Sequence, residues 1–517
     1  MSKLTASIPV VEEPSALYAN RVRVYPKAVK GLDRRIKWAI LILCLGVYYL
    51  LPWLRLDRGP YLPHQAVLMS IWTERFYFFG LEFWPQDIWF LAGLLIMSAL
   101  GLFLVTSLVG RVWCGYTCPQ TVWTDLFMWV ERRIEGDRNA RMKRDQGPVT
   151  LDKVWRKVLK HTVWLAIAFW TGGAWIMYFV DAPTVTREFW TGTASVEVYV
   201  FTGLFTATTY ALAGWAREQV CTYMCPWPRF QSAMLDEQSI IVTYQGWRGE
   251  PRGHGKRHPV KTGTVARTGT AAGIGAGAGI GAGAMPVAGA DAEGKIKPLG
   301  DCIDCGACVH VCPTGIDIRD GLQLECIGCG LCIDACNEVM KKTGAKPWLI
   351  TWDTLARQAA HAEGREAPLR ILRPRTFIYV GVLIVAAAIL ATSLMLRSND
   401  GLSVLHDRAP LFIRLSNGEL RNAYTLKLIN KSSEPVNYHL TTSAIPGAEL
   451  IQPDLGPGVR SELTLNVGPD SIGSYRVLVQ APGGAGENGS RPLDFVLTNP
   501  DTGRKTIYRS AFIGPAQ

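Results

Sequence analysis

Eight of the thirteen cysteines stand in one short stretch of the chain, between Cys302 and Cys336. They form two runs with the spacing C-x2-C-x2-C-x3-C, the first followed by proline: Cys302, Cys305, Cys308 and Cys312, then Cys326, Cys329, Cys332 and Cys336. In bacterial two-cluster ferredoxins of this spacing, three cysteines of a run bind one [4Fe-4S] cluster and the fourth binds the other cluster. The spacing therefore predicts two [4Fe-4S] clusters, one on Cys302, Cys305, Cys308 and Cys336 and one on Cys326, Cys329, Cys332 and Cys312.

The residues around these runs agree with cluster binding. Gly306, Gly328 and Gly330 allow tight turns that bring backbone N–H groups near sulfur. One departure is Asn337, which stands where the first run has Pro313. Two zinc ribbons or a disulfide knot are the alternatives, but zinc sites usually separate two cysteine pairs by a dozen or more residues.

A second pattern, C-x-Y-x-C-P, occurs twice. The first copy is Cys114 to Pro119 and the second is Cys221 to Pro226, and each follows a pair of long apolar runs. The chain thus contains an internal repeat in parallel orientation, whose halves we expect to be related by an axis along the membrane normal.

The prolines of this pattern suit the first turn of a new helix, so Cys118 and Cys225 are predicted near helix N-termini, where the thiolate is favoured. If the two copies pack together, Cys114, Cys118, Cys221 and Cys225 could form one site for Cu(I) or another soft metal, or two dithiols that carry electrons. The alternative is two pairs of buried packing cysteines. Tyr116 and Tyr223 are expected to pack at the interface.

The elements that must position these cysteines are membrane helices. Of the 517 residues, 48% are hydrophobic and 18 are tryptophans, and several uncharged apolar runs approach or exceed the length that crosses a bilayer. Five spans are predicted, at residues 38–54, 88–110, 162–180, 198–216 and 376–396. The first four, with both C-x-Y-x-C-P copies, define a membrane domain at 38–230.

The net charge of +11 lies beside these spans, which argues against nucleic acid as the partner. Lys and Arg gather before the first span, between the second and third, and after the fourth. By the positive-inside rule, the N-terminus, both motif copies and the cysteine-rich module are cytoplasmic, and the segment after the fifth span is periplasmic. The sequence thus predicts a multi-pass protein of the bacterial cytoplasmic (inner) membrane.

The remaining segments follow from composition. Residues 1–37 are read as a cytoplasmic tail, and 231–295 as a cytoplasmic segment ending in a Gly/Ala-rich stretch. Glycine at this density disfavours a helix, so the stretch is interpreted as a flexible tether for the ferredoxin module at 296–345; a further span is the alternative. Residues 401–517 alternate apolar and polar positions between turns, which predicts an all-β immunoglobulin-like sandwich.

This combination resembles the cytochrome c oxidase accessory proteins of the CcoG, FixG and RdxA family, which are membrane-bound polyferredoxin-type proteins. The resemblance implies a cupric reductase that converts Cu(II) to Cu(I) for the assembly of cbb3-type cytochrome c oxidase. It implies that copper is a substrate or bound ion at Cys114, Cys118, Cys221 and Cys225, and that the eight clustered cysteines form the electron relay. Oxidase subunits or their assembly factors, an electron donor not named by the sequence and a homodimer are the partners it suggests.

Two other functions fit part of the pattern. Electron-transfer subunits that link quinol to periplasmic reductases share the paired C-x3-C-P motifs and the ferredoxin module, but the terminal β-domain argues against this class. A non-enzymatic assembly scaffold with structural clusters is the third reading.

Overall fold

The computed structural model describes residues 23–60, 62–253, 299–432, 434–453, 458–482 and 489–515. The chain divides into two compact units, Met1–Leu54 with Ala66–Ala386, and Arg55–Gln65 with Ala387–Gln517. The Gly/Ala-rich stretch interpreted as a tether and residues 1–22 of the predicted tail lie outside the described residues. The two units are therefore treated one at a time.

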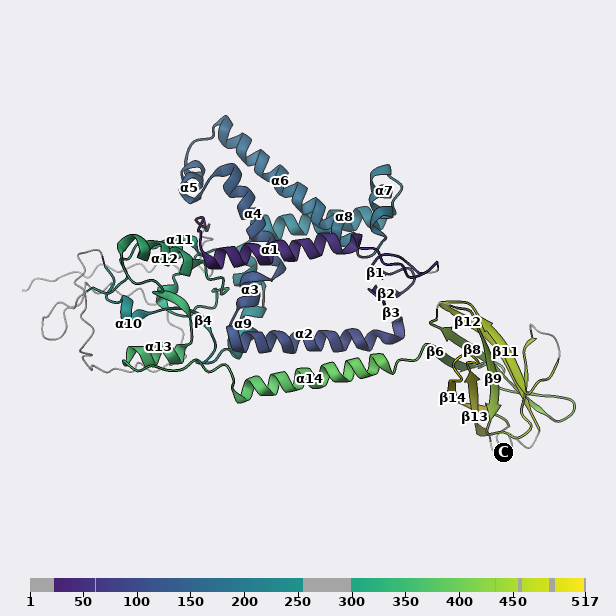
Figure 1. Cartoon of the computed structure of the whole chain (residues 1–517). Coiled ribbons are helices and arrows are strands. Elements are labelled where there is room, and N and C mark those ends of the chain that lie inside the picture. Colours follow the sequence, from purple (N-terminus) through teal and green to yellow (C-terminus); the bar gives the residue numbers. More distant parts are fainter. Residues whose placement is uncertain are drawn as a thin grey trace, which may run out of the picture. The chain divides into compact units, whose positions relative to one another are not determined.

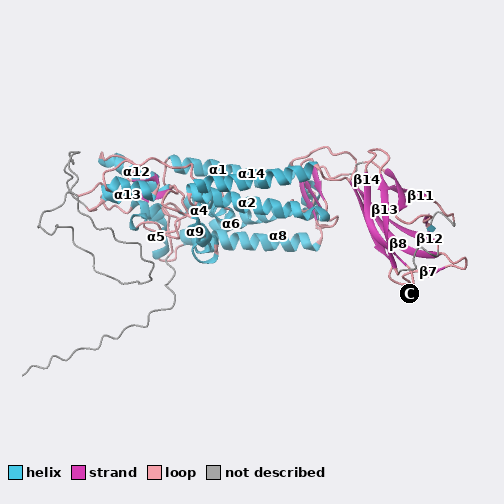
Figure 2. Cartoon of the chain, turned by 90° about the horizontal axis from the view of Figure 1, so that it is seen from below, coloured by secondary structure: helices cyan, strands magenta, loops and turns pink. Residues whose placement is uncertain are grey.

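Long helices form the body of the first unit (Figures 1 and 2). They are α1 (Leu32–Leu50), α2 (Ile88–Val109), α6 (Leu151–Ile176), α8 (Val196–Thr209) and α14 (Pro374–Met395), the last of which continues into the second unit. The 3-10 turns η1 (Leu51–Trp53) and η2 (Pro85–Asp87) flank α1 and α2, and the π-helix η3 (Tyr210–Ala216) extends α8. Among the described residues, four helical stretches are long and apolar enough to cross a membrane: Leu32–Trp53, Pro85–Val109, Val196–Ala216 and Pro374–Met395.

The third predicted span, 162–180, differs from the structure. Residues 162–176 belong to α6, which begins eleven residues earlier, at Leu151, and ends at Ile176, four residues before the predicted end of the span. This helix is not among the four apolar ones. Lys160, His161 and four tryptophans lower its hydropathy, and Lys160 is buried in ion pairs rather than placed at a helix end.

Short elements lie at the two ends of these helices (Figure 1). At one end is a three-stranded antiparallel sheet, β1 (Val67–Ser70), β2 (Arg75–Phe78) and β3 (Leu81–Phe83). At the other end lie α3 (Val112–Tyr116), α4 (Pro119–Glu135), α5 (Arg138–Gln146), the π-helix η4 (Val220–Met224) and α9 (Trp227–Met234). The helix α7 (Ala182–Thr191) connects α6 to α8.

The ferredoxin module occupies the same end as α3 and α9. Its elements are β4 (Ile241–Tyr244), α10 (Gly246–Gly249), α11 (Ala307–Val311), η5 (Ile318–Asp320), α12 (Leu331–Thr343), β5 (Ile350–Asp353) and α13 (Leu355–Ala362). Strands β4 and β5 pair antiparallel, so residues before and after the cysteine runs close the module. Its apolar core includes Val242, Ile333 and Leu349 together with the buried Cys302, Cys308 and Cys336.

The second unit contains the predicted sandwich. One sheet has the order β10-β12-β8-β6, with β7 also paired to β8, and the other has the order β11-β9-β13-β14. The strands are β6 (Asp400–His406), β7 (Ile413–Arg414), β8 (Leu420–Asn430), β9 (Val436–Ser443), β10 (Glu449–Ile451), β11 (Glu462–Val467), β12 (Ser471–Ala481), β13 (Ser490–Thr498) and β14 (Lys505–Ile513). Every second residue of β8 is buried, as expected for a strand with one face in the core.

Candidate redox site

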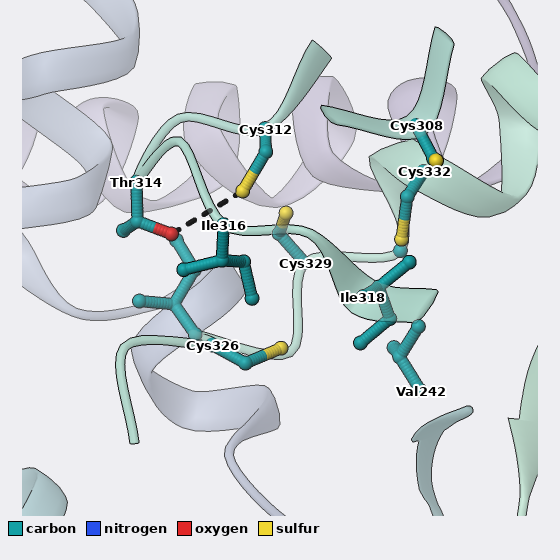
Figure 3. A pocket seen from close by; sticks show the side chains of 11 residues that line it. Val242, Cys308, Cys312, Thr314, Ile316, Ile318, Cys326, Cys329 and Cys332 are labelled. Carbon is teal, nitrogen blue, oxygen red and sulfur yellow. Dashed lines mark hydrogen bonds between the residues drawn. The ribbon is translucent and has the colours of Figure 1, made fainter. Parts of the chain in front are cut away.

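The eight clustered cysteines line two pockets in the ferredoxin module. Cys312, Cys326, Cys329 and Cys332 line one pocket, and Cys302, Cys305, Cys308 and Cys336 line the other. Figure 3 shows the sulfur atoms of the first set turned toward a common space, with Cys308 at its edge. The structure thus groups the cysteines into the two sets that the spacing predicts, with the fourth cysteine of each run exchanged.

The residues present fit two iron–sulfur clusters. Each pocket offers four cysteine thiols, the donor set of a [4Fe-4S] cluster. Gly306, Gly328 and Gly330 have positive φ values of 62°, 63° and 69°, a conformation that glycine adopts without steric cost. A [4Fe-4S] cluster, when bound, supplies one-electron transfer.

The departure at Asn337 has a structural explanation. In the first run Pro313 follows Cys312, and α11 ends at Val311. In the second run α12 continues past Cys336 to Thr343. The Asn337 Oδ1 accepts a hydrogen bond from the backbone N–H of Trp348 at 2.7 Å, so the asparagine secures the loop that returns to β5.

Burial raises the pKa of the pocket thiols, to about 12 for Cys326, about 11 for Cys308 and about 12 for Cys336. Without a metal these thiols are therefore neutral near pH 7. Metal binding requires thiolates, so cluster assembly releases protons and becomes easier as the pH rises.

The motif cysteines lie beside the first set of pocket cysteines, the one with Cys329 and Cys332. Cys114 and Cys221 pack against the same apolar cluster as Cys329, Cys332 and Ile327. Burial, and then the proximity of Cys118, raises the pKa of both Cys114 and Cys221 to about 12. Among the described residues, no group of three or more His, Cys, Asp or Glu side chains is arranged to hold a single metal ion.

Local structure places the motif cysteines as the prolines predict. Cys118 is the N-cap residue of α4, with Pro119 in the first helical position. Cys225 directly precedes Pro226, the N-cap residue of α9. The Cys114 thiol donates a hydrogen bond to Gln231 Oε1 at 3.1 Å. Gln231 is fully buried on α9, and no spacing pattern in the sequence marks it as a site residue.

The first motif copy is packed directly onto the cluster-binding loop. A Cβ atom on Gly115 would lie 2.7 Å from the Gly328 carbonyl oxygen, so any other side chain would force this contact apart. The buried Tyr116 hydroxyl donates to the Cys329 carbonyl and to Asp33 Oδ1, each at 3.2 Å. Burial, followed by the charge of Asp33, raises the pKa of Tyr116, which keeps the hydroxyl a donor.

Two charged groups complete this contact between the module and the membrane helices. Arg111 donates to the carbonyl oxygens of Leu324, Cys326 and Pro228 and so joins the cluster loop to α9. Asp334, on α12, accepts hydrogen bonds from the first backbone N–H groups of α1, including that of Arg34 at 2.8 Å. Sequence reasoning missed both roles because the partners lie one hundred to three hundred positions apart.

The second motif copy has a different backbone. Arg111 and Cys114 are separated by two residues, whereas Arg217 and Cys221 are separated by three. The structure accommodates the extra residue in the π-helices η3 and η4, a form often found at functional sites. Tyr223 is 74% exposed, so the expectation that it packs at the interface is wrong.

Buried ion pairs hold the second copy against α4. Arg217 reaches Glu131 at 3.0 Å, and Glu131 also meets Arg141 at 2.7 Å and Lys160 at 3.5 Å. Burial alone would raise the pKa of Glu131, but Arg217 and Arg141 outweigh it and lower the pKa to about 2. The carboxylate is therefore ionised across the physiological range.

Comparison with known proteins agrees with this architecture. A "4Fe-4S dicluster domain" family matches residues 216–276 and 284–355, and a "4Fe-4S binding domain" family matches residues 91–136. An "IG-like fold at C-terminal of FixG" family matches residues 390–515. The chain thus contains 4Fe-4S binding domains followed by an immunoglobulin-like domain.

Similar proteins cover nearly the whole chain. "Nitrogen fixation protein FixG" of Rhizobium meliloti is 44% identical over 96% of this chain and 93% of its own length. "Protein RdxA" of Cereibacter sphaeroides is 44% identical over 96% of this chain and 98% of its own length. A crystal structure of a FixG-related protein from Vibrio parahaemolyticus, 23% identical, matches 23% of this chain and 97% of that one with a TM-score of 0.20.

Proposed function

The chain belongs to the FixG/RdxA family, and from that premise we propose that it is a membrane-bound iron–sulfur oxidoreductase that reduces Cu(II) to Cu(I). The Cu(I) would serve the assembly of cbb3-type cytochrome c oxidase. One observation carries the proposal: Cys114 and Cys221 pack against the loop that contains Cys329. Soft thiol ligands therefore lie next to a pocket with the ligands of an iron–sulfur cluster.

The motif cysteines suit the product of this reaction. Cu(I) is a soft ion that prefers thiolates, so a thiolate site favours reduction and retains the reduced ion. The exposed Tyr223 and Met224 of η4 mark the side from which copper would reach the cysteines. The Gln231 amide would orient the Cys114 sulfur, and the packed Gly115 would keep the cluster loop at a fixed position.

The same proposal includes a topology and partners. The basic loops favour a cytoplasmic ferredoxin module and a periplasmic sandwich in a bacterial inner membrane. The sandwich would then contact oxidase subunits or their assembly factors, and a homodimer fits the family resemblance. Reporter fusions after Trp247 and after Gly401 test this arrangement, which requires opposite sides of the membrane for the two positions.

The decisive experiment compares paired Ser variants with cluster-ligand variants in anaerobically purified protein. Cys114→Ser/Cys118→Ser and Cys221→Ser/Cys225→Ser should abolish Cu(II) reduction while iron content and cluster paramagnetic resonance signals stay intact. Serine keeps the size of cysteine but loses the soft thiolate. Cys326→Ser should remove a cluster and slow reduction, yet leave Cu(I) binding to the motif cysteines in place.

Other outcomes identify the alternatives. Copper reduction at the wild-type rate in the paired variants would show that copper meets the clusters elsewhere. A loss of iron in those variants, from more than eight irons per chain in the wild type, would assign a further cluster to the motif cysteines. An unchanged reduction rate after cluster loss would favour the assembly-scaffold reading.

A further inference from the structure

A cavity of about 790 Å³, its open mouth included, lies between α6 and η3. His161 and Trp164 line it from α6, Trp215 lines it from η3, and Glu218 follows on the chain toward η4. Its volume is within the range of small-molecule sites, about 300–1,000 Å³. None of these residues belongs to the cysteine sites described above.

The walls of the cavity are aromatic. The His161 ring lies 5.2 Å from the ring of Trp164, nearly perpendicular to it, and 6.2 Å from that of Trp215 at 30°. A Cβ atom on Gly214 would lie 3.2 Å from Trp164, so glycine lets this indole lie close against η3. Trp215 is 58% exposed and forms an outer wall. Such walls suit a flat, conjugated ring.

The positive side chains of the cavity already have carboxylate partners. Lys160 pairs with Glu135 at 2.9 Å, and Arg217 pairs with Glu131 at 3.0 Å. Lys157 and Arg23 both pair with Asp145, at 2.8 and 3.1 Å. Each of these cations therefore already has an anionic partner within the protein, which favours an uncharged ligand over a phosphate or a nucleotide.

Two further features suit a ligand that is oxidised or reduced in the cavity. His161 Nδ1 lies 2.8 Å from the Tyr210 hydroxyl, so this contact holds one ring nitrogen and the other ring nitrogen can accept a proton. Glu218 lines the cavity and lies about one helical turn before Cys221 on the same segment. A ligand that contacts Glu218 would thus touch the segment that leads to Cys221.

We infer that this cavity binds a hydroquinone of the membrane pool, which serves as the electron donor. This inference rests on the proposed function for its electron acceptor, Cu(II). One hydroquinone loses two electrons and two protons and becomes the quinone, while two Cu(II) ions become two Cu(I). His161 accepts the hydroxyl protons one at a time, and they leave to water at the mouth beside Arg23 and Lys157.

Binding is tested first, with decylubiquinone titrated calorimetrically into purified full-length protein in detergent. The expected result is a single site per chain. Trp215→Ala should weaken binding about tenfold, the effect of one aromatic contact worth about 1.4 kcal/mol. Trp155→Ala is the matched control, because Trp155 is an exposed tryptophan of α6 that does not line the cavity.

Electron donation is tested next, with decylubiquinol as reductant and cluster absorbance as the signal. His161→Gln should slow this reduction about a hundredfold, the usual contribution of a proton acceptor, without loss of iron. The ratio of quinol consumed to Cu(I) formed in the wild type should be one to two.

Each contrary outcome would overturn a specific part of the inference. Equal binding and equal reduction rates in wild type, Trp215→Ala and His161→Gln would remove the site from this cavity. Clusters that dithionite reduces but decylubiquinol does not would exclude a hydroquinone as donor, and displacement of decylubiquinone by phosphatidylglycerol would assign the cavity to a lipid. If decylubiquinol reduces the clusters but Cu(II) is not reduced, the proposed function fails while the cavity assignment stands.

Discussion

The two C-x-Y-x-C-P copies share a sequence pattern but not an environment. In the first copy Gly115 and Tyr116 are buried against the cluster-binding loop. In the second copy Thr222 stands in place of Gly115, and Tyr223 is largely exposed. Arg111 donates to the backbone carbonyls of Leu324 and Cys326 in the module, whereas Arg217 pairs with the buried Glu131.

This difference indicates a division of roles within the repeat. The first copy is shaped to dock the ferredoxin module, and its thiol Cys114 is held by Gln231. The second copy leaves its π-helical turn open and is anchored mainly by ion pairs, although Cys221 packs against the apolar cluster that contains Cys329. Each of the following changes should affect one copy and spare the other.

Acid should loosen the second copy more than the first. Because the pKa of Glu131 is lowered to about 2 in the folded protein, its ion pairs stabilise the fold fully above the ordinary carboxyl pKa of about 4.3. That contribution, about 3 kcal/mol, is lost as the pH falls from about 4.5 toward 2. The rate of backbone amide hydrogen exchange, corrected for intrinsic rates, should rise in η4 over this pH interval and should not rise in α3.

Glu131→Gln is the control for this acid effect. It should expose η4 to exchange already at pH 7, since it leaves Arg217 without its carboxylate, and further acid should then add little. Equal acid sensitivity of α3 and η4 in the wild type would contradict the proposed difference between the two anchors.

Gly115→Ala should disturb the first copy alone. The added methyl group would meet the Gly328 carbonyl at 2.7 Å, and overpacking of this kind costs about 2 kcal/mol. We expect a lower melting temperature of the module and a slower transfer of electrons from reduced clusters to Cu(II). Gly101→Ala is the matched control, because no atom other than those of its chain neighbours and its own helix backbone lies within 4 Å of its Cβ position.

A Gly115→Ala variant with wild-type melting and wild-type transfer would show that the module need not stay packed on α3. Slower transfer with unchanged melting would instead locate the effect in the distance between the cluster loop and Cys114.

The cluster cysteines could be predicted because their chemistry fixes their spacing. Cys302 to Cys336 contain two repeats of a ligand pattern, and the structure sorts them into the predicted pockets. The strands of the sandwich follow the period-two pattern in the same way, and every second residue of β8 is buried. Cysteine spacing and the alternation of apolar residues are local patterns, and they predict the local backbone geometry.

The docking contacts could not be predicted, because they join residues far apart in the chain. Asp334 caps α1 across about three hundred positions, and Gln231 meets Cys114 across more than one hundred. The exposure of Tyr223 was missed for a related reason. The single residue inserted between Arg217 and Cys221 is visible in the sequence, but its effect on the helix depends on the packing around it.

The smallest effect is expected for the two tyrosines. Tyr116→Phe removes the hydroxyl that donates to Cys329 O and to Asp33, and the loss of a buried hydrogen bond costs about 1 kcal/mol. Asp33 keeps its bond from Trp352 Nε1 at 3.0 Å, so the module should remain docked with a slightly lower melting temperature. Tyr223→Phe should leave the melting temperature unchanged, since that hydroxyl belongs to an exposed side chain. If both variants lower the melting temperature equally, the two copies contribute equally to docking and the division of roles is wrong.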